Sequence, residues 1–214
     1  MNLELHHFFI LVEPGAKVAD LLCSLGMKEG ARNKHEGQGT SNRRFNFSNG
    51  TLEILWINDV EEATQGPGQK MYLYERSQDV MASPFGLVFN RKDNSSLKMP
   101  FEGWHYQPDY FKPPMGFHVG QNSSYLLEPL CVYMPFIEPD TSVGKVEEGV
   151  FSVISNVNVS TTSESLSDTL GIVSTTDRLE VNHGKEHLME IIFDNHRHDQ
   201  SRDLRPDLPL IIRW

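Results

Sequence analysis

The feature that most constrains the fold is a pattern of secondary-structure signals that occurs twice, once toward each end of the chain. In the first copy, an aromatic and β-branched segment at residues 3–12 precedes residues 16–25, whose apolar positions have helical spacing and end at Gly26. Asn49-Gly50 follows between two strand-like runs within residues 41–57, which is a strong hairpin signal. The predicted order is strand, helix, short strand and hairpin.

The second copy begins at residues 151–159, which have the composition of a strand. Thr161-Thr162-Ser163-Glu164 has the spacing of a capping box and predicts a short helix that ends at Leu170-Gly171. Strand signals return at residues 175–181 and 187–193. The elements therefore have the same order as in the first copy.

Two short sequence echoes reinforce this pattern. LLCSLG at residues 21–26 is similar to LSDTLG at residues 166–171, and LEIL at residues 52–55 is similar to MEII at residues 189–192. Because both echoes occur in the same order around the same predicted elements, they indicate a duplicated supersecondary unit. We therefore divide one structural domain into a first module (residues 1–65), a middle section (residues 66–147) and a second module (residues 148–214).

The middle section adds strands and a stiff loop. Residues 83–89 and 116–119 have strand-like composition, whereas residues 99–114 contain four prolines together with Trp104 and Tyr106. A loop this apolar is not a free linker. Two interpretations stay open: the loop covers an edge of the core, or it forms a wall of a ligand pocket.

Composition limits the environment and the partners. The 214 residues are 38% hydrophobic, which suits one large domain or two closely packed modules. No apolar run approaches the roughly 18–20 residues of a membrane helix, and the first residues lack a secretory signal, so we expect a cytoplasmic protein without a membrane partner. A net charge of −10 without a basic cluster argues against nucleic acid. Cys23 and Cys131 are expected to be reduced core residues.

Two ionisable residues interrupt apolar stripes on predicted strands. Because side chains alternate along a strand, His7 should share its face with Leu5 and Phe9, and Glu53 should share its face with Leu55. A carboxylate among apolar neighbours is costly unless it is paired, hydrogen-bonded or bound to a cation. The carboxylate is therefore the most informative group of the first half.

Two interpretations of Glu53 stay open. It forms an ion pair with Arg43 or Arg44 across the hairpin, or it belongs to a functional site. Together with the imidazole of His7, its carboxylate suits Zn, Fe, Ni or Mn, and further ligands from the second half would complete a metal site.

The second half supplies only part of such a site. Glu190 occupies the position equivalent to Glu53, but the strand at residues 153–157 has no histidine, and Asn156 is a poor ligand for a transition metal. His118 and Glu128 in the middle section are candidate substitutes.

A glycine-rich stretch at residues 35–45 precedes the hairpin. It has neither Walker spacing nor a GxGxxG motif, so we expect no nucleotide cofactor. It is either a β-edge loop with satisfied hydrogen bonds or a loop whose backbone approaches a ligand closely. In the second case the candidate ligand-binding residues of this stretch are His35, Gln38, Thr40, Asn42 and Arg44.

Several motifs together resemble the glyoxalase-like group of the vicinal oxygen chelate superfamily. They include LHHFFILV at residues 5–12, the stretch at residues 35–45, and LEILW at residues 52–56. SPFG at residues 83–86 and RPDLP at residues 205–209 are similar to uncharacterised members of comparable length. The resemblance covers nearly the whole chain, with the sharpest motifs in the first half.

The resemblance implies an α/β (α+β) fold in which paired βαβββ modules form a curved, incompletely closed mixed β-barrel. It also implies divalent-metal ligands on the first and fourth strands of each module, which correspond to His7, Glu53, Asn156 and Glu190. The superfamily also has members that have lost ligands and bind small molecules without catalysis, so fold alone does not decide the reaction.

Two functions follow as expectations, for a monomer or a homodimer. The first is a metal-dependent lyase, isomerase or dioxygenase acting on vicinal oxygens, with Glu53 and Glu190 catalytic and one Zn, Ni, Fe or Mn ion held by His7, Glu53, Glu190 and His118. The alternative is a metal-free protein that sequesters or senses a small, partly apolar molecule. Beyond the glycine-rich stretch, its ligand-binding residues would be Trp56, Trp104, Tyr106 and Glu128. A purely structural module is the weakest interpretation, because it leaves the polar residues on apolar stripes unexplained.

Overall fold

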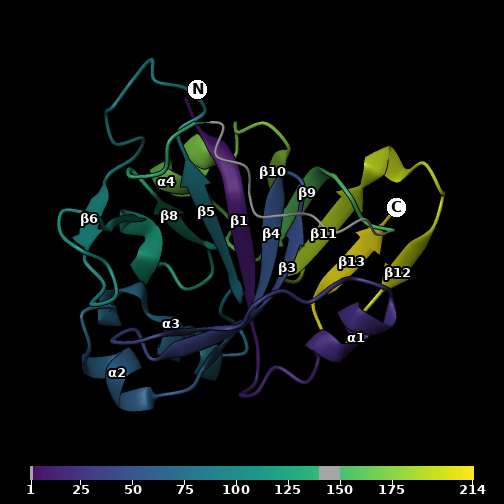
Figure 1. The fold of residues 1–214 in the computed structure, drawn as a ribbon, viewed down its shortest axis with the longest axis horizontal. Helices are drawn as coiled ribbons and strands as arrows, with labels where there is room; N and C mark the ends of the chain where they lie inside the picture. Colours follow the sequence, from purple (N-terminus) through teal and green to yellow (C-terminus); the bar gives the residue numbers. More distant parts are fainter. Residues whose placement is uncertain (1, 140–149) are drawn as a thin grey trace.

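The computed structural model describes residues 2–139 and 150–214, which form two β-sheets that lie side by side (Figure 1). The larger sheet is an open, strongly curled half-barrel of eight mixed strands, and the smaller sheet has five strands. The predicted fold class, a mixed α and β protein with a curved and incompletely closed barrel, is confirmed.

Residues 4–57 build one half of the larger sheet. Its elements are β1 (Glu4–Leu11), α1 (Ala19–Ser24), β2 (Asn33–His35), β3 (Thr40–Phe47) and β4 (Gly50–Ile57). β1 is parallel to β4, whereas β4 and β3, and β3 and β2, are antiparallel pairs. This is the strand, helix and three-strand order that the sequence predicts for the first module.

Local signals set the ends of α1 and of the hairpin. Gly26 follows α1 with a φ of +95°, and its amide donates to the carbonyl of Cys23 at 2.9 Å, as a left-handed helix cap requires. In the hairpin, Phe47 pairs with Gly50. The two-residue turn is therefore Ser48-Asn49, one residue earlier than the sequence pattern suggests.

The middle section builds the other half of the same sheet. Its strands are β5 (Phe85–Asn90), β6 (Gly103–Tyr106), β7 (Phe117–Gly120) and β8 (Leu130–Tyr133). β5 is antiparallel to β1 and parallel to β8, and the full order is β2-β3-β4-β1-β5-β8-β7-β6. This half therefore repeats the strand arrangement of the first, with a coil at residues 91–102 in place of the helix.

Short helices connect these strands. α2 (Val60–Gln65), the 3-10 helix η1 (Gln69–Met71) and α3 (Leu73–Gln78) lie between β4 and β5, and η2 (Gln121–Ser124) joins β7 to β8. Asp59 caps α2 by accepting a hydrogen bond from the Glu62 amide at 3.0 Å. In Figure 1, α2 and α3 lie at the opposite end of the molecule from β12 (Ser201–Asp203) and β13 (Leu210–Arg213) of the smaller sheet.

The C-terminal segment forms the smaller sheet. Besides β12 and β13, its elements are β9 (Ile154–Thr161), α4 (Asp168–Val173), β10 (Leu179–His183), β11 (Leu188–Phe193) and η3 (Asp194–His196). The strand order is β10-β9-β11-β13-β12. β9 is parallel to β10 and antiparallel to β11, and β11 is parallel to β13.

The prediction that residues 148–214 supply the second module of the barrel needs correction. The partner of the first module in its sheet is the middle section, and the C-terminal segment forms a sheet of its own. β10 and β11 follow each other in sequence, yet they lie on either side of β9, because the connection through α4 places β10 parallel to β9.

The helix of the C-terminal segment begins later than predicted. Thr161 ends β9, and its hydroxyl donates to the carbonyl of Leu127. Ser167 is the actual cap of α4, because its Oγ accepts a hydrogen bond from the Leu170 amide at 3.2 Å. The helix then continues through Gly171, where the sequence pattern suggested an end.

Two hydrophobic clusters cover the two faces of the larger sheet. Phe8 and Ile10 of β1 belong to the cluster between the sheets, whereas Phe9 and Leu11 belong to the cluster on the inner face of the half-barrel. An irregularity in the pairing of β1 with β5 falls between Leu5 and His7. Leu5 consequently joins the cluster between the sheets, so it does not share a face with the imidazole as predicted.

Side chains that bond to backbone hold the two sheets together. The Asn49 side chain in the β3–β4 turn donates to the carbonyl of Ile154 at 2.9 Å and accepts from the amide of the same residue at 2.9 Å. Arg178 donates to the carbonyls of Asn49 at 3.2 Å and Leu5 at 3.3 Å. The β3–β4 turn thus forms hydrogen bonds with the start of β9, as a neighbouring strand would.

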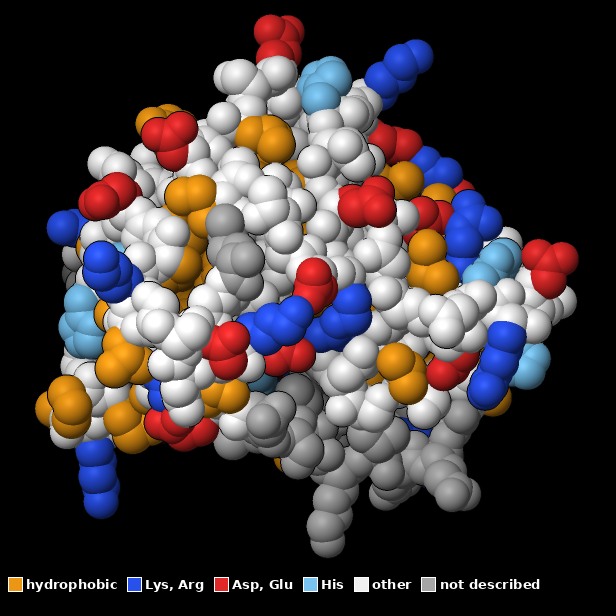
Figure 2. Space-filling model, turned by 90° about the horizontal axis from the view of Figure 1, so that it is seen from above, with side chains coloured by type: hydrophobic (Ala, Val, Ile, Leu, Met, Phe, Trp, Pro, Cys, Tyr) orange, Lys and Arg blue, Asp and Glu red, His pale blue; other side chains and the backbone are white. Residues whose placement is uncertain are grey.

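The face drawn in Figure 2 is mixed in charge. Figure 2 shows acidic and basic side chains interspersed over one face of the molecule. No helix in residues 2–139 or 150–214 is long and apolar enough to span a membrane. Cys131 is buried and Cys23 is partly buried, and both are free thiols.

Candidate functional site

The inner face of the half-barrel holds a small cavity of about 90 Å³. Strands from both halves of the larger sheet line it, so it lies inside the curl. The aliphatic and phenylalanine side chains of its walls include Phe9, Leu55, Val88, Phe117, Leu130 and Val132. Apart from two tyrosines, the polar side chains that line the cavity are His7, His35, Gln38 and Glu53.

Glu53 lies on β4 and faces the cavity with Leu55, as the alternation of the strand predicts. The residue is only 8% exposed. Its carboxylate accepts no hydrogen bond within the described residues, and its one charged contact is Arg44 Nε at 3.3 Å. That contact lacks hydrogen-bond geometry, since the same Nε has no hydrogen-bond partner.

Arg44 stands directly opposite Glu53 in the β3–β4 pairing. The expected ion pair across the hairpin therefore forms, while the Glu53 side chain also lines the cavity. Arg43 points to the other side, where it bonds Asp20 at 2.8 Å and Glu29 at 2.5 Å. The charge of the buried carboxylate is thus balanced by one partly exposed guanidinium, while its hydrogen-bonding capacity remains unused.

His7 lines the same cavity as Glu53. The irregularity in β1 brings the rings of His6 and His7 together, with their Nδ1 atoms 2.9 Å apart. Burial, followed by the neighbouring imidazole and Arg44, lowers the pKa of His6 to about 4, and burial followed by Arg44 lowers the pKa of His7 to about 3. Both rings are therefore neutral near pH 7, one donating and the other accepting.

His35 enters the cavity from β2. Its Nδ1 lies 2.9 Å from the Thr40 hydroxyl, and the oxygen of that hydroxyl accepts a hydrogen bond from Gln38 Nε2 at 2.8 Å. Burial lowers the pKa of His35, so this ring is also neutral. The loop that carries it is fixed by Glu62, which accepts from the amide of Gly37 at 2.9 Å.

Two tyrosines cover the cavity, Tyr106 at the end of β6 and Tyr110 in the chain that follows. Tyr106 is 1% exposed, and its hydroxyl has no hydrogen-bond partner within the described residues. The ring of Tyr110 lies 5.9 Å from that of His35. Burial raises the pKa of both phenols, so each keeps its proton. Tyr106 and Tyr110 thus place part of the loop at residues 99–114 in a wall of the pocket, one of the two roles considered for this loop.

Several predicted ligand-binding residues do not line the cavity. Trp56 packs against the cluster between the sheets, on the far side of β4 from the cavity. Trp104 does not line the cavity, and its Nε1 lies 3.5 Å from Ser123 Oγ. Asn42 is buried and accepts from the Asn33 amide at 2.9 Å, which secures the β2 edge. The prediction for Trp56 is wrong because side chains alternate along β4, and Trp56 lies on the opposite face of the strand from Glu53.

The predicted metal ligands do not converge. His7 and Glu53 share the cavity, but His118 on β7 bonds the carbonyl of Phe101 at 2.8 Å. Glu190 lies in the smaller sheet, where it contacts Arg213 and accepts from Asn158 Nδ2 at 2.9 Å. No cluster of three or more His, Cys, Asp or Glu side chains in residues 2–139 and 150–214 is placed to hold a metal ion. The four-ligand site predicted from the sequence does not fit this structure.

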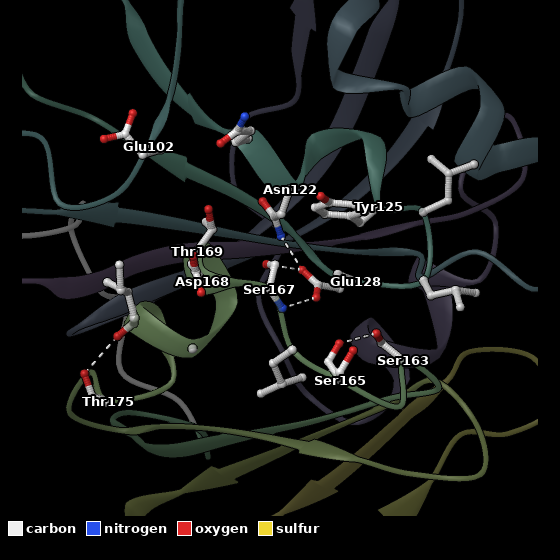
Figure 3. A pocket seen from close by; sticks show the side chains of 16 residues that line it. Glu102, Asn122, Tyr125, Glu128, Ser163, Ser165, Ser167, Asp168, Thr169 and Thr175 are labelled. Carbon is white, nitrogen blue, oxygen red and sulfur yellow. Dashed lines mark hydrogen bonds between the residues drawn. The ribbon is translucent and has the colours of Figure 1, made fainter.

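Glu128 lines a second, larger groove between the sheets (Figure 3). Its carboxylate accepts from the amide and the hydroxyl of Ser167, each at 2.6 Å, and from Asn122 Nδ2 at 3.1 Å. Figure 3 shows these three bonds converging on the carboxylate. The residue is 2% exposed. It therefore joins η2 and β8 to the start of α4, and the predicted ligand-binding role is replaced by a structural one.

The cavity also contains residues that the sequence analysis did not single out. Met71 ends η1, Leu73 begins α3, and Tyr110 comes from the proline-rich loop. Gly86 shapes the cavity indirectly, because a Cβ at this position would lie 2.0 Å from the Phe9 ring. The glycine in the SPFG motif was the only sequence signal for this close approach.

Comparisons with known proteins support the fold alone. A scan against models of protein families finds no match, and a search of curated proteins finds no similar sequence. A hypothetical protein from Staphylococcus aureus matches with a TM-score of 0.59 and 13% identity, covering 99% of this chain and 98% of that chain. A hypothetical protein from Bacillus halodurans C-125 has a TM-score of 0.41 and 13% identity, covering 69% of this chain and 100% of that chain.

The fold and the cavity together define an open half-barrel protein with a small, mostly apolar pocket on its inner face. The Staphylococcus aureus protein shares this fold over nearly its whole length.

Proposed function

We propose that this protein binds a small, mostly apolar molecule in the inner cavity of the half-barrel, without a metal ion. The observation that carries the proposal is the composition of the walls. Apolar side chains from β1, β4, β5, β7 and β8 surround the space, and a few polar groups gather beside them. Apolar walls with a small number of placed polar groups are typical of small-molecule sites.

The size of the cavity limits which ligands it can hold. A space of about 90 Å³ suits a single small ring or a short aliphatic chain. Burying such a group would contribute roughly 25 cal/mol for each Å² of apolar surface removed from water.

The metal-dependent lyase, isomerase or dioxygenase is not the function that the geometry supports best. Its ligand set would need Glu190 and His118 beside His7, and the first two are bonded elsewhere. The resemblance to the glyoxalase-like group remains part of our proposal. It is supported by the two strand units that meet at β1 and β5 and by a pocket on their shared inner face.

Toluene binding tests the proposal, because toluene is a single ring of suitable size. We expect it to raise the midpoint of thermal unfolding, by about 2–4 °C for each kcal/mol of binding free energy. Leu130→Phe should abolish that shift, because Leu130 is 1% exposed and lines the cavity. Leu127→Phe is the matched control, because Leu127 is 41% exposed and lines the other groove.

The ligand-free midpoints of both variants must be measured first, since an added ring strains a packed site. A toluene shift that persists in folded Leu130→Phe, or that disappears equally in the control, would contradict the proposal. So would a wild-type protein that does not respond to toluene.

A further inference from the structure

We infer that the natural ligand of the inner cavity carries a hydroxyl group, which accepts a hydrogen bond from His35 and donates one to Glu53. The inference deepens the proposed function and rests on it. A buried carboxylate and a partly buried imidazole face one cavity without bonding to each other.

The carboxylate of Glu53 is the acceptor in this arrangement. Buried carboxylates are normally satisfied by several donors, because an unmet charge is costly away from water. Glu128 shows this in the same molecule, with three donors on its two oxygens. Glu53 is nearly as buried, yet its carboxylate accepts no hydrogen bond from the described residues. A donor from a ligand would fill this need.

The hydrogen-bond donor in this arrangement is Nε2 of His35. The hydrogen bonds of Thr40 identify which ring nitrogen carries the hydrogen. Its hydroxyl oxygen accepts from Gln38, and the only acceptor in contact with its hydrogen among the described residues is Nδ1 of His35. The hydroxyl therefore donates to Nδ1, and a neutral imidazole then carries its hydrogen on Nε2. That Nε2 has no hydrogen-bond partner within residues 2–139 and 150–214.

The charges around the cavity favour a neutral group over an ion. Arg44 offsets the charge of Glu53, and the three imidazoles at this end are neutral. An ammonium would face the guanidinium, and a carboxylate would face Glu53. A hydroxyl carries no net charge and both donates and accepts, so it can satisfy His35 and Glu53 together.

Phenol and toluene provide the test, because they have the same shape and differ by a hydroxyl in place of a methyl group. We would measure their dissociation constants by calorimetric titration at neutral pH for the full chain. Glu53→Gln should weaken phenol binding by about tenfold, because a charge-assisted bond becomes a neutral one. Glu53→Leu should weaken it further, and toluene binding should stay within about twofold in the Gln variant.

Glu190→Gln is the matched control, because it removes an equivalent β-strand carboxylate of the smaller sheet. Its phenol affinity should equal that of the wild type. Folded Glu53→Leu protein that still binds phenol as tightly as wild type would overturn the inference, and so would wild type that binds toluene but not phenol. If neither compound binds wild type, the proposed function itself fails.

Discussion

At the residue scale, the paired histidines of β1 show how burial sets a chemical state. The two Nδ1 atoms lie 2.9 Å apart, a distance at which one ring must donate and the other accept. Protonation of the accepting ring would leave two hydrogens facing each other, and burial disfavours a charge on either ring. The pair therefore stays neutral, and His7 presents a neutral ring to the cavity.

The same pair predicts a pH dependence of stability. In the unfolded chain each imidazole has a pKa near 6.5, whereas the folded values are about 4 for His6 and about 3 for His7. The unfolded state binds more protons between these values, so the free energy of unfolding is highest above pH 6.5 and falls as the pH decreases toward 4. The slope should approach 1.4 kcal/mol per pH unit for each ring, about the limit for one proton.

Urea unfolding of wild type and His7→Gln at several pH values between about 7 and 4.5 measures this effect. The variant should lose part of the slope because one buried ring is gone. His105→Gln, at an exposed position, should keep the wild-type slope. Equal slopes in wild type and His7→Gln would show that this imidazole does not stay neutral in the folded chain.

Gly86 gives a second prediction at the residue scale. A Cβ at this position would lie 2.0 Å from Cε1 of Phe9, so Gly86→Ala must displace the ring toward the cavity. We expect a loss of about 1–3 kcal/mol in the free energy of unfolding, as for other overpacked sites. Phe9→Leu should recover part of that loss in the double variant, because it removes the clashing atoms.

A denaturant-based double-mutant cycle checks this coupling. Gly171→Ala serves as the comparison, since its Cβ would meet no atom within 4 Å and the position is helical. It should leave stability unchanged or raise it by about 0.5–1 kcal/mol. Strict additivity of Gly86→Ala and Phe9→Leu would mean that the two residues do not compete for the same space.

At the element scale, the β3–β4 hairpin does two tasks. Its strands place Arg44 opposite Glu53, which lines the cavity, and its turn binds the backbone of β9 through Asn49. The amide side chain imitates a peptide group, with one donor and one acceptor aligned on Ile154. The hairpin therefore links the inner face of one sheet to the start of β9 in the other.

Asn49→Ala should consequently lower the free energy of unfolding by about 1–3 kcal/mol, because Ile154 is 1% exposed and would lose both hydrogen bonds to the Asn49 side chain, while its carbonyl keeps only the longer bond from Arg178 at 3.4 Å. Asn182→Ala, at an exposed position of β10, should change it by less than about 0.5 kcal/mol. Chemical denaturation of both variants decides the matter. A neutral effect of Asn49→Ala would indicate that the sheets do not depend on this link.

Local signals account for the elements that the sequence predicts well. The glycine cap of α1 and the hairpin of β3 and β4 each depend on a few adjacent residues, so both can be read without tertiary information. The start of α4 could not be read in this way. Thr161 and Ser167 are both suitable caps, and the bond of Thr161 to the distant Leu127 carbonyl decides between them.

At the scale of the whole molecule, the two halves of the larger sheet are related by their strand order. β1 and β5 are antiparallel neighbours, and each is parallel to the last strand of its own half. This relation cannot be seen in the sequence, because the middle section has no helix after its first strand and contains neither of the two sequence echoes. The echoes at residues 166–171 and 189–192 pointed instead to the segment that forms the separate sheet.

The candidate site was predicted in part. His7, His35, Gln38, Glu53 and Tyr106 do meet in one cavity, because strand alternation and the glycine-rich loop can be read from the sequence. Glu190 and His118 could not be placed correctly, since their positions depend on which segments pair in space. Tyr110 was missed because no periodic pattern indicates where a proline-rich loop folds back.

The central claim is that a small, mostly apolar molecule enters the inner cavity, and methyl NMR during a toluene titration tests it most directly. We expect changes in the chemical shifts of the methyl groups of Val88, Leu130 and Val132, which line that cavity. The methyl groups of Leu127 and Leu166 line the groove between the sheets and should not move. Shifts confined to Leu127 and Leu166, or an absence of shifts at the three cavity residues, would contradict the account.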